Sequence, residues 1–399
     1  MTPALTILMV TYGVPYPPHG GSRIRNLNAI RCLSRRHSLI VLSLAWDPEE
    51  ARYLPVLRQH CEHVDMVLNR RSRGASVAAL AVGCLAGRPW GAYPYYFPAM
   101  ARKIRDVVAD RHIDVAVFDQ IYVAPYVDAI PAGHRCRRVL SLHDVASSQY
   151  RSMVRIQPSR LGRARQTVRW RLMARMERRY LGRFDHGVVV SAPEARRLRA
   201  RHPTLPISII ENGVDTSLCR PLAEPAHGHG VLFVGDMQYG PNADGVRYFV
   251  DAIFPAIRAA VPDVTLSVVG HQPPIRPSDH VVVTGRIGDP TPYYEAAQVV
   301  VVPLRAGGGT RLKILEAMAR GRPVVSTSIG CEGLEVTDGE HLLVADTPSG
   351  FAGRVTDLLE SPELRARIGR NARRLVESRY DWSIINRKLA ALYGEPLGA

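Results

Sequence analysis

The chain has 399 residues, of which 46% are hydrophobic and 22% are charged. This composition excludes a disordered chain, and the length exceeds what one hydrophobic core usually supports, so two domains are expected. The 52 lysine and arginine residues outnumber the 36 aspartate and glutamate residues, and the formal net charge of +16 attracts anions such as phosphorylated metabolites, nucleic acid or anionic lipid.

The most apolar run, SVAALAVGCLAG at residues 76–87, is too short to cross a bilayer and too far inside the chain to be a signal peptide. A buried helix is predicted there. The six cysteines form no CxxC pair and have no ordered spacing, which argues against a zinc site or a disulfide framework and fits a reducing cytoplasm.

The amino-terminal half alternates apolar runs with helical patterns. The first run, LTILMV at 5–10, is followed by a glycine- and proline-rich loop at 11–22 and by a segment with apolar residues at helical spacing. Further strands are expected near 38–44, 64–68, 114–118, 138–142, 186–190 and 207–210. This alternation predicts a parallel sheet covered on both faces.

The segment 211–230 carries prolines and glycines with little periodicity, as expected for a connector between domains. A second series of strands is expected near 231–235, 265–270, 280–285, 299–304 and 322–327, with a helix near 243–260. We predict an α/β protein of two doubly wound domains, 1–212 and 213–380. A final helix at 381–399 could pack back on the amino-terminal domain.

The stretch GGGTRLKILEAM at 307–318 follows a predicted strand and opens a predicted helix. Glycines there let backbone N–H groups approach an anion, and the helix start adds the positive end of its dipole. Each cation at that end is unfavourable by roughly 0.3–1 kcal/mol unless an anion is bound. The residues predicted to bind a diphosphate are Gly307, Gly308, Gly309, Thr310, Arg311 and Lys313. The alternative is a glycine turn with two solvated basic side chains.

Glu316 lies three residues after Lys313 on the same helix, among apolar neighbours. A carboxylate can accept two hydrogen bonds from the hydroxyls of a ribose, which is the role predicted for it. A salt bridge between Glu316 and Lys313 is the alternative.

Several motifs together carry a resemblance to a known family. They are LKILEAMARGRPVVST, the preceding VVVVPLRAGGGT, ENGVD at 211–215, and FVGDMQYGPNADGVRYF at 233–249. With them the chain resembles family 4 of the retaining nucleotide-sugar glycosyltransferases. These have the GT-B fold of two Rossmann-like domains facing a cleft. TYGVPYPPHGGSRIRN and SLHDV look like segments of bacterial sugar transferases that build exopolysaccharide or related cell-surface glycans.

The resemblance implies roles for single residues. Of two glutamates that the family typically places eight positions apart, the second matches Glu316 and would hold the donor's ribose, whereas the first falls on Gly308. This departure removes a side chain that usually touches the donor sugar. The loop at 235–245 also lacks the arginine and lysine that many members use there to bind the diphosphate, so Arg311 and Lys313 are the predicted substitutes.

His143 matches the family's active-site histidine, which contacts the donor sugar near its reacting carbon; the alternative is a structural histidine. Gly20 and Gly21 resemble the glycines that let the first loop approach the donor phosphate, and a plain surface loop is the alternative.

Three further residues are assigned to the donor site. They are Gly235, in the first loop of the second domain, and Arg286 and Ile287, where the family commonly grips the nucleobase through backbone groups. In ENGVD, Asn212 and Gly213 tolerate positive φ and Asp215 can cap locally, so these three are assigned to chain geometry.

The arginine-rich segment 160–183 is predicted to be an amphipathic helix. Its predicted apolar face consists of Leu161, Ala164, Val168, Leu172, Met176 and Tyr180. A basic amphipathic helix can lie on an anionic membrane, where a lipid-linked acceptor would be found. The alternative is a surface helix whose apolar face packs on the sheet.

No metal or other cofactor is expected, because no DxD pair or cluster of histidines and carboxylates has ligand spacing. The combined prediction is a retaining glycosyltransferase in the cytoplasm. It is either free there or bound peripherally to the inner face of the membrane. It would move sugar from a nucleotide diphosphate sugar to a glycan or lipid-linked saccharide. A nucleotide-sugar epimerase of the same fold is the first alternative. A basic nucleic-acid-binding protein is the second, and the spread of arginines over both halves argues against it.

Overall fold

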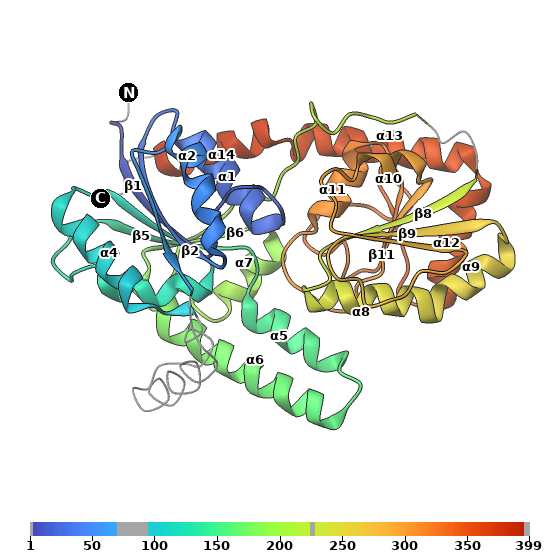
Figure 1. Cartoon of the computed structure of the whole chain (residues 1–399), viewed down its shortest axis with the longest axis horizontal. Coiled ribbons are helices and arrows are strands. Elements are labelled where there is room, and N and C mark those ends of the chain that lie inside the picture. The colour runs from blue at the N-terminus through green and yellow to red at the C-terminus, as the bar shows by residue number, and fades with distance from the viewer. Residues whose placement is uncertain (1–2, 70–94, 224–227, 395–399) are drawn as a thin grey trace. The chain divides into compact units, whose positions relative to one another are not determined.

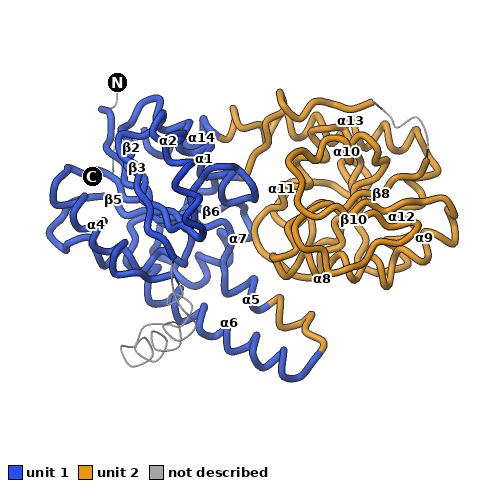
Figure 2. The backbone as a smooth tube through the Cα atoms, viewed as in Figure 1, with its two compact units in different colours: residues 1–151, 159–211, 386–399 blue, residues 152–158, 212–385 orange. Residues whose placement is uncertain are grey.

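The computed structural model describes residues 3–69, 95–223 and 228–394. The chain forms two compact units (Figure 2). Unit 1 consists of residues 1–151, 159–211 and 386–399, and unit 2 of residues 152–158 and 212–385. The helix predicted at 76–87 lies outside the described residues.

Unit 1 contains a parallel sheet of seven strands in the order β3-β2-β1-β4-β5-β6-β7. The strands are β1 (Thr6–Thr11), β2 (Ser38–Ala45), β3 (His63–Leu68), β4 (Val115–Asp119), β5 (Arg137–Leu142), β6 (His186–Val189) and β7 (Ile207–Ile209). Each lies within about two residues of its predicted position. The strands β1, β2 and β4 are mostly apolar and buried along nearly their whole length, because helices cover both faces of the sheet.

The helices of unit 1 follow the strands as the alternation predicted. They are α1 (Gly21–Leu33), α2 (Leu54–Arg58), α4 (Pro98–Asp110), α5 (Ala146–Arg155), α6 (Arg160–Tyr180), α7 (Ala192–Arg199) and the last part of α14 (Trp382–Gly394), with 3-10 turns at Pro48–Tyr53, Ile121–Ala129 and Leu181–Arg183. The end of α14 belongs to this unit, where Asn28 Nδ2 donates to Asn386 Oδ1 at 2.6 Å.

Unit 2 contains a parallel sheet of six strands in the order β10-β9-β8-β11-β12-β13. The strands are β8 (His229–Val234), β9 (Val264–Val269), β10 (Val281–Gly285), β11 (Val299–Val302), β12 (Val324–Ser326) and β13 (Leu343–Val344). The last was not predicted, because a two-residue strand gives no pattern.

Helices cover both faces of the second sheet (Figure 1). One face is covered by α8 (Gly240–Tyr248), α9 (Phe254–Ala260) and α12 (Pro348–Glu360), and the other by α10 (Thr291–Ala296), α11 (Leu312–Ala319) and α13 (Pro362–Arg379). The single helix predicted at 243–260 is interrupted by a π turn at Phe249–Ile253.

Helix α6 forms as predicted, and only part of its predicted apolar face is buried. Met176 and Tyr180 are buried, whereas Leu161 and Val168 are 80% and 56% exposed. The alternative in which the apolar face packs on the protein therefore holds only for the second half of the helix.

The longer part of unit 2 begins at Asn212, within the ENGVD segment, and the geometry of this segment corrects one expectation. Neither Asn212 nor Gly213 has positive φ. Gly213 is needed for space instead, because a Cβ on it would lie 2.8 Å from the ring of Trp382. Asp215 does cap locally, since its Oδ1 accepts from the backbone N–H of Ser217 at 3.0 Å.

Candidate functional site

The glycine loop between β11 and α11 has a backbone that suits glycine. Gly307 has φ 138° and Gly309 has φ 68°, in the left-handed region. A Cβ on Gly307 would also lie 2.8 Å from Arg311 Nη2. The N–H of Gly307 donates to Ser152 Oγ at 3.0 Å, so this amide has a protein partner within unit 2 that an anion would have to replace.

Arg311 occupies the N-cap position of α11, and its side chain folds back on the loop. Its guanidinium is buried and donates to the carbonyl oxygens of Gly308 and Gly309. These oxygens compensate a cation at the positive end of the helix. The charge of Arg311 therefore has a structural explanation that does not require a bound diphosphate. Its neighbour Thr310 accepts from Asn212 Nδ2 at 2.9 Å, which ties the loop to ENGVD.

Lys313 reaches from α11 to the turn that follows β8. Its Nζ donates to Asn242 Oδ1 at 2.8 Å and lies 4.5 Å from the centre of the Phe233 ring. A Cβ on Gly235 would lie 2.7 Å from the same Nζ. The structure thus brings two predicted site residues together, and it places a cation at the 235–245 loop, which has no basic residue of its own.

The surroundings of Lys313 disfavour its charge. Burial lowers the pKa of this ammonium group to about 7, and the nearby Arg311 acts in the same direction, while Glu316 opposes them. The hydrogen-bond partner of Nζ, Asn242 Oδ1, is a neutral amide oxygen. An anion that reached Nζ would therefore restore the charged form.

Glu316 contacts a tyrosine. The hydroxyl of the fully buried Tyr294 donates to Glu316 Oε2 at 3.3 Å, and the guanidinium of Arg320 lies 4.5 Å from the centre of the Tyr294 ring. Burial raises the pKa of the Glu316 carboxyl, and Arg320 opposes this shift. The contact with Tyr294 was in neither of the predicted alternatives.

The remaining predicted residues of unit 2 follow β10. Gly285 ends the strand with φ 73°, Arg286 is exposed, and Ile287 is partly buried against the apolar cluster that contains Tyr294. They therefore lie at the same edge of the sheet as the loops after β8 and β11.

In unit 1, His143 follows β5 and lies in a polar cluster. Its Nε2 is 2.8 Å from Asp119 Oδ1, within ion-pair distance though not aligned as a hydrogen bond. Its Nδ1 is 3.3 Å from Gln120 Nε2. Asp119 is buried and accepts from Asn26 Nδ2 at 2.7 Å and from Ser22 Oγ at 3.4 Å. Both ring nitrogens of His143 therefore face protein groups.

The same cluster includes the start of α1. Gly20 precedes the helix with φ 97°, and Gly21 is its first residue. Gln120, itself at φ 72°, donates from Nε2 to Ser22 Oγ at 3.1 Å. Ser22 thus links the predicted glycines to the predicted histidine.

Sequence reasoning missed Asp119, Gln120, Asn242 and Tyr294. A signal existed for Asp119, because it is a single acid at the end of the otherwise apolar strand VAVFD. For Asn242 and Tyr294 the sequence gives no comparable signal.

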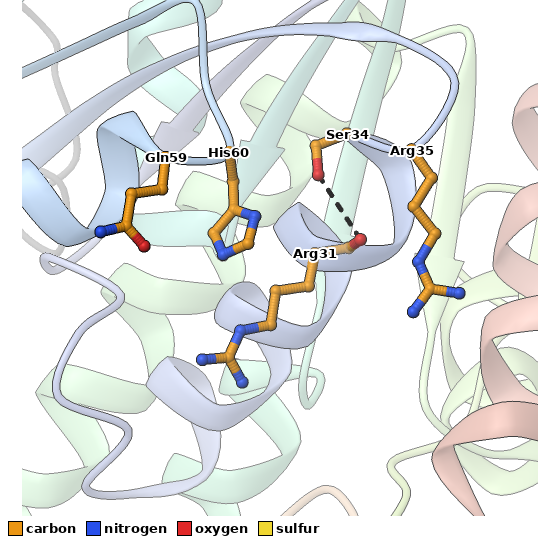
Figure 3. Close-up of a pocket in the computed structure, with 5 residues that line it drawn as sticks. All are labelled: Arg31, Ser34, Arg35, Gln59 and His60. Carbon is orange, nitrogen blue, oxygen red and sulfur yellow. Dashed lines mark hydrogen bonds between the residues drawn. The ribbon is translucent and has the colours of Figure 1, made fainter.

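A hollow of about 390 Å³ opens elsewhere on unit 1 (Figure 3). Its lining residues are Arg31, Ser34, Arg35, Gln59 and His60. It lies at the carboxyl end of α1, whose 13 residues span roughly 20 Å, so it is remote from Gly20 and Gly21 at the other end. It does not belong to the predicted site.

In residues 3–69, 95–223 and 228–394, no three His, Cys, Asp or Glu side chains are grouped closely enough to hold a metal ion. In the same ranges, no helix combines the length and the apolar character that crossing a membrane requires.

Two family models match the chain. The model described as Glycosyltransferase Family 4 matches residues 19–218, and the model described as Glycosyl transferases group 1 matches residues 228–361.

Two relatives of known description illustrate the similarity. Phosphatidyl-myo-inositol mannosyltransferase of Mycobacterium tuberculosis is 30% identical over 209 residues, which are 48% of this chain and 54% of that protein. D-inositol 3-phosphate glycosyltransferase of Corynebacterium glutamicum is 27% identical over 223 residues, 48% of this chain and 52% of that protein. The chain spans about half the length of the curated relatives it matches.

Solved structures match over nearly the whole chain. Sucrose-phosphate synthase from Thermosynechococcus elongatus has a TM-score of 0.75 at 20% identity, over 98% of both chains. Anabaena HepE in complex with UDP-glucose has a TM-score of 0.68 at 17% identity, over 98% of this chain and 99% of that one. The predicted fold class, two doubly wound Rossmann-like domains of the GT-B type, is confirmed.

Proposed function

The chain belongs to glycosyltransferase family 4, and from this premise we propose that it is a retaining glycosyltransferase. In this proposal it moves a sugar from a nucleotide diphosphate sugar to a glycan or a lipid-linked saccharide. The products are the extended acceptor and the nucleotide diphosphate.

The observation that carries the proposal is the position of Lys313. Its Nζ lies at the turn after β8, next to Gly235, with a neutral amide as hydrogen-bond partner. A leaving diphosphate develops negative charge, and a cation already fixed in place stabilises that charge in the transition state. Lys313 is therefore the residue to which we assign the diphosphate. Arg311 has a secondary part because its guanidinium already holds the loop.

The other roles complete a donor site. Glu316 accepts hydrogen bonds from the ribose hydroxyls, Arg286 and Ile287 border the nucleobase, and His143 contacts the sugar near its reacting carbon. The positive charge comes from Lys313, Arg311 and the start of α11, so the proposal gives no step to a metal ion. Transfer activity should accordingly persist in the presence of a chelator.

Two relatives support a phosphorylated or lipid-linked acceptor. One is named a phosphatidyl-myo-inositol mannosyltransferase and the other a D-inositol 3-phosphate glycosyltransferase. We place the protein in the cytoplasm, peripheral on the inner face of the membrane, in the synthesis of exopolysaccharide or another cell-surface glycan. The sequence motifs quoted for the amino-terminal half support that setting.

The test is a thermal-shift screen of UDP, GDP, ADP and dTDP sugars on the wild type, Glu316→Ala and Lys313→Ala. One nucleotide should stabilise the wild type, and both variants should lose most of that stabilisation. Lys103→Ala is the matched control, since Lys103 pairs with Asp65 in unit 1 and should respond as the wild type does. Equal stabilisation of all four proteins would overturn the assignment of the pocket.

A nucleotide-sugar epimerase would use the same donor site. Incubation of the stabilising donor without acceptor separates the two functions. A transferase should only hydrolyse the donor slowly, whereas conversion of the donor into an epimeric nucleotide sugar would favour the alternative.

A further inference from the structure

The first half of α6 presents apolar side chains to solvent. Leu161 is 80% exposed and Val168 is 56% exposed, whereas Met173, Met176 and Tyr180 farther along the helix are buried. Among the described residues of the chain, five large hydrophobic side chains are this exposed, and two of the five lie on this helix. The hydrophobic core of unit 1 therefore accounts for the packing of only the second half of α6.

The exposed residues share one face of the helix. Positions 161, 164, 168 and 172 are spaced by three or four residues, so Leu161, Ala164, Val168 and Leu172 form one stripe. Arg165, Arg171 and Arg175 lie three or four positions from members of this stripe and border it. All three arginines are exposed.

The charge on this helix is of one sign. Residues 160–183 include nine arginines and one acid, Glu177. Glu177 is 2% exposed, and its carboxylate accepts from the backbone N–H and hydroxyl of Ser147 and from Arg201. The one acid of this segment is therefore buried, and the exposed side of α6 carries only positive charge. A polyanionic surface with an apolar layer beneath it complements such a face.

We propose that the first half of α6, Arg160–Leu172, docks on an anionic phospholipid bilayer. Leu161 and Val168 enter the boundary between headgroups and acyl chains, and the bordering arginines pair with lipid phosphates. The use of this contact rests on the proposed function, because a lipid-linked acceptor is presented at such a surface. The contact itself follows from the exposure and charge of the helix.

Other occupants fit the face less well. A second copy of the chain would bring the same arginines against each other in a two-fold interface, which like charges oppose. Nucleic acid would neutralise the arginines, but its phosphates would not bury the exposed Leu161 and Val168 of the stripe.

Vesicle sedimentation with the full chain tests the proposal. The wild type should sediment with vesicles of phosphatidylcholine mixed with phosphatidylglycerol and should remain in solution with phosphatidylcholine alone. The double variant Leu161→Glu, Val168→Glu should bind the anionic vesicles at least about tenfold more weakly. Leu218→Glu is the matched control, because Leu218 is also 80% exposed but lies in unit 2.

A second pair of variants tests the charge. In the first triple variant, serine replaces Arg165, Arg171 and Arg175. In the control triple variant, serine replaces Arg258, Arg276 and Arg370. Both triple variants lose the same net charge, so only the first should lose vesicle binding if the location of the arginines matters. Equal loss in both would overturn docking through α6.

Further results would also overturn the proposal. One is that the wild type does not bind the vesicles. Another is that the double glutamate variant binds them as well as the wild type does. A third is that the double glutamate variant keeps its vesicle binding but changes its oligomeric state. Nucleotide-sugar stabilisation of the same variants keeps the two ideas apart. Loss of vesicle binding with donor stabilisation intact supports the docking. Absence of donor stabilisation in the wild type would count against the proposed function alone.

Discussion

The imidazole of His143 and the carboxylate of Asp119 are in contact, with Nε2 and Oδ1 2.8 Å apart. The contact follows from the topology of the first sheet. Strands β4 and β5 pair in parallel, with Asp119 opposite Ser141, so residues at their carboxyl ends emerge side by side. Asp119 is only 2% exposed, and its other oxygen accepts from Asn26. A buried carboxylate placed in this way orients the ring of His143.

The first prediction concerns Asp119→Asn, which keeps the size of the side chain and removes its charge. Loss of a charged contact at the imidazole should lower kcat/KM for sugar transfer by about tenfold or more. Nucleotide stabilisation in a thermal-shift assay should stay at the wild-type level, because the proposed nucleotide contacts are in unit 2. Ser22→Ala is the comparison, since it removes the weaker 3.4 Å contact to the same carboxylate and the hydroxyl that accepts from Gln120, but keeps the charge beside the imidazole. A parallel loss of nucleotide binding would contradict this division of roles.

The second prediction uses the lowered pKa of Lys313, about 7. Above that pH the free protein holds this amine largely neutral, and a bound diphosphate favours the charged form. Nucleotide binding should therefore take up a proton above about pH 7 and weaken as the pH rises further. Calorimetry in buffers of different ionisation enthalpy measures this uptake. Lys313→Met should abolish it, and uptake that persists in this variant would point to another group.

The same shift has a consequence for stability, the third prediction. The unfolded chain keeps the ordinary lysine pKa of 10.5, so between about pH 7 and that value the unfolded state binds the extra proton and stability rises with pH. Lys313→Met removes this contribution. The variant should therefore gain most stability over the wild type below about pH 7. This difference in the free energy of unfolding should shrink as the pH rises towards alkaline values. A difference independent of pH between wild type and variant would show that the ammonium is well solvated.

Much of this architecture could be predicted because strands in a covered parallel sheet are continuous apolar runs. The turns after those runs then had to lie at the carboxyl edges, which placed His143, Gly235 and the 307–309 loop correctly along the chain. Pair contacts could not be predicted in the same way. Asp119 with His143, and Lys313 with Asn242, meet because of strand order and helix rotation, which a local pattern does not encode.

Two features that the sequence left open have a shared physical origin. The sequence shows a cation at the start of α11, but it does not show that the Arg311 side chain turns back to the carbonyl oxygens of its own loop. Similarly, helical spacing identified an apolar stripe on α6 without showing where the body of unit 1 ends beneath it. In both cases the residue pattern was correct, but the contacts that these side chains make within the protein could not be read from it.

The fourth prediction tests the glycine loop. Gly307→Ala places a Cβ 2.8 Å from Arg311 Nη2 at φ 138°, and such backbone strain should lower the free energy of unfolding by about 1–3 kcal/mol. Gly353→Ala is the matched control within the same unit, because Gly353 lies inside α12 with no atom within 4 Å of its Cβ position. It should raise stability by about 0.5–1 kcal/mol. Thermal unfolding compares the two, and equal effects would refute the role given to the loop.

The last prediction separates the ribose from the diphosphate. Glu316→Ala should weaken binding of the nucleoside diphosphate by about tenfold, since hydrogen bonds to a charged carboxylate are lost. Inorganic pyrophosphate has no ribose, so its affinity for this variant should equal that for the wild type. Lys313→Ala should weaken both ligands, because both present the same charge to Nζ.

Tyr294→Phe serves as the control for that comparison. It removes the hydroxyl that donates to Glu316 Oε2 at 3.3 Å and leaves the carboxylate in place. Ribose hydroxyls can then use both oxygens of Glu316, so nucleotide affinity should be kept or increased. Competition binding with the two ligands measures all three variants. Near Glu316, the two ligands differ only in the ribose. If Glu316→Ala weakens the binding of pyrophosphate as much as the binding of the nucleotide, the carboxylate shapes the phosphate site and does not hold the ribose.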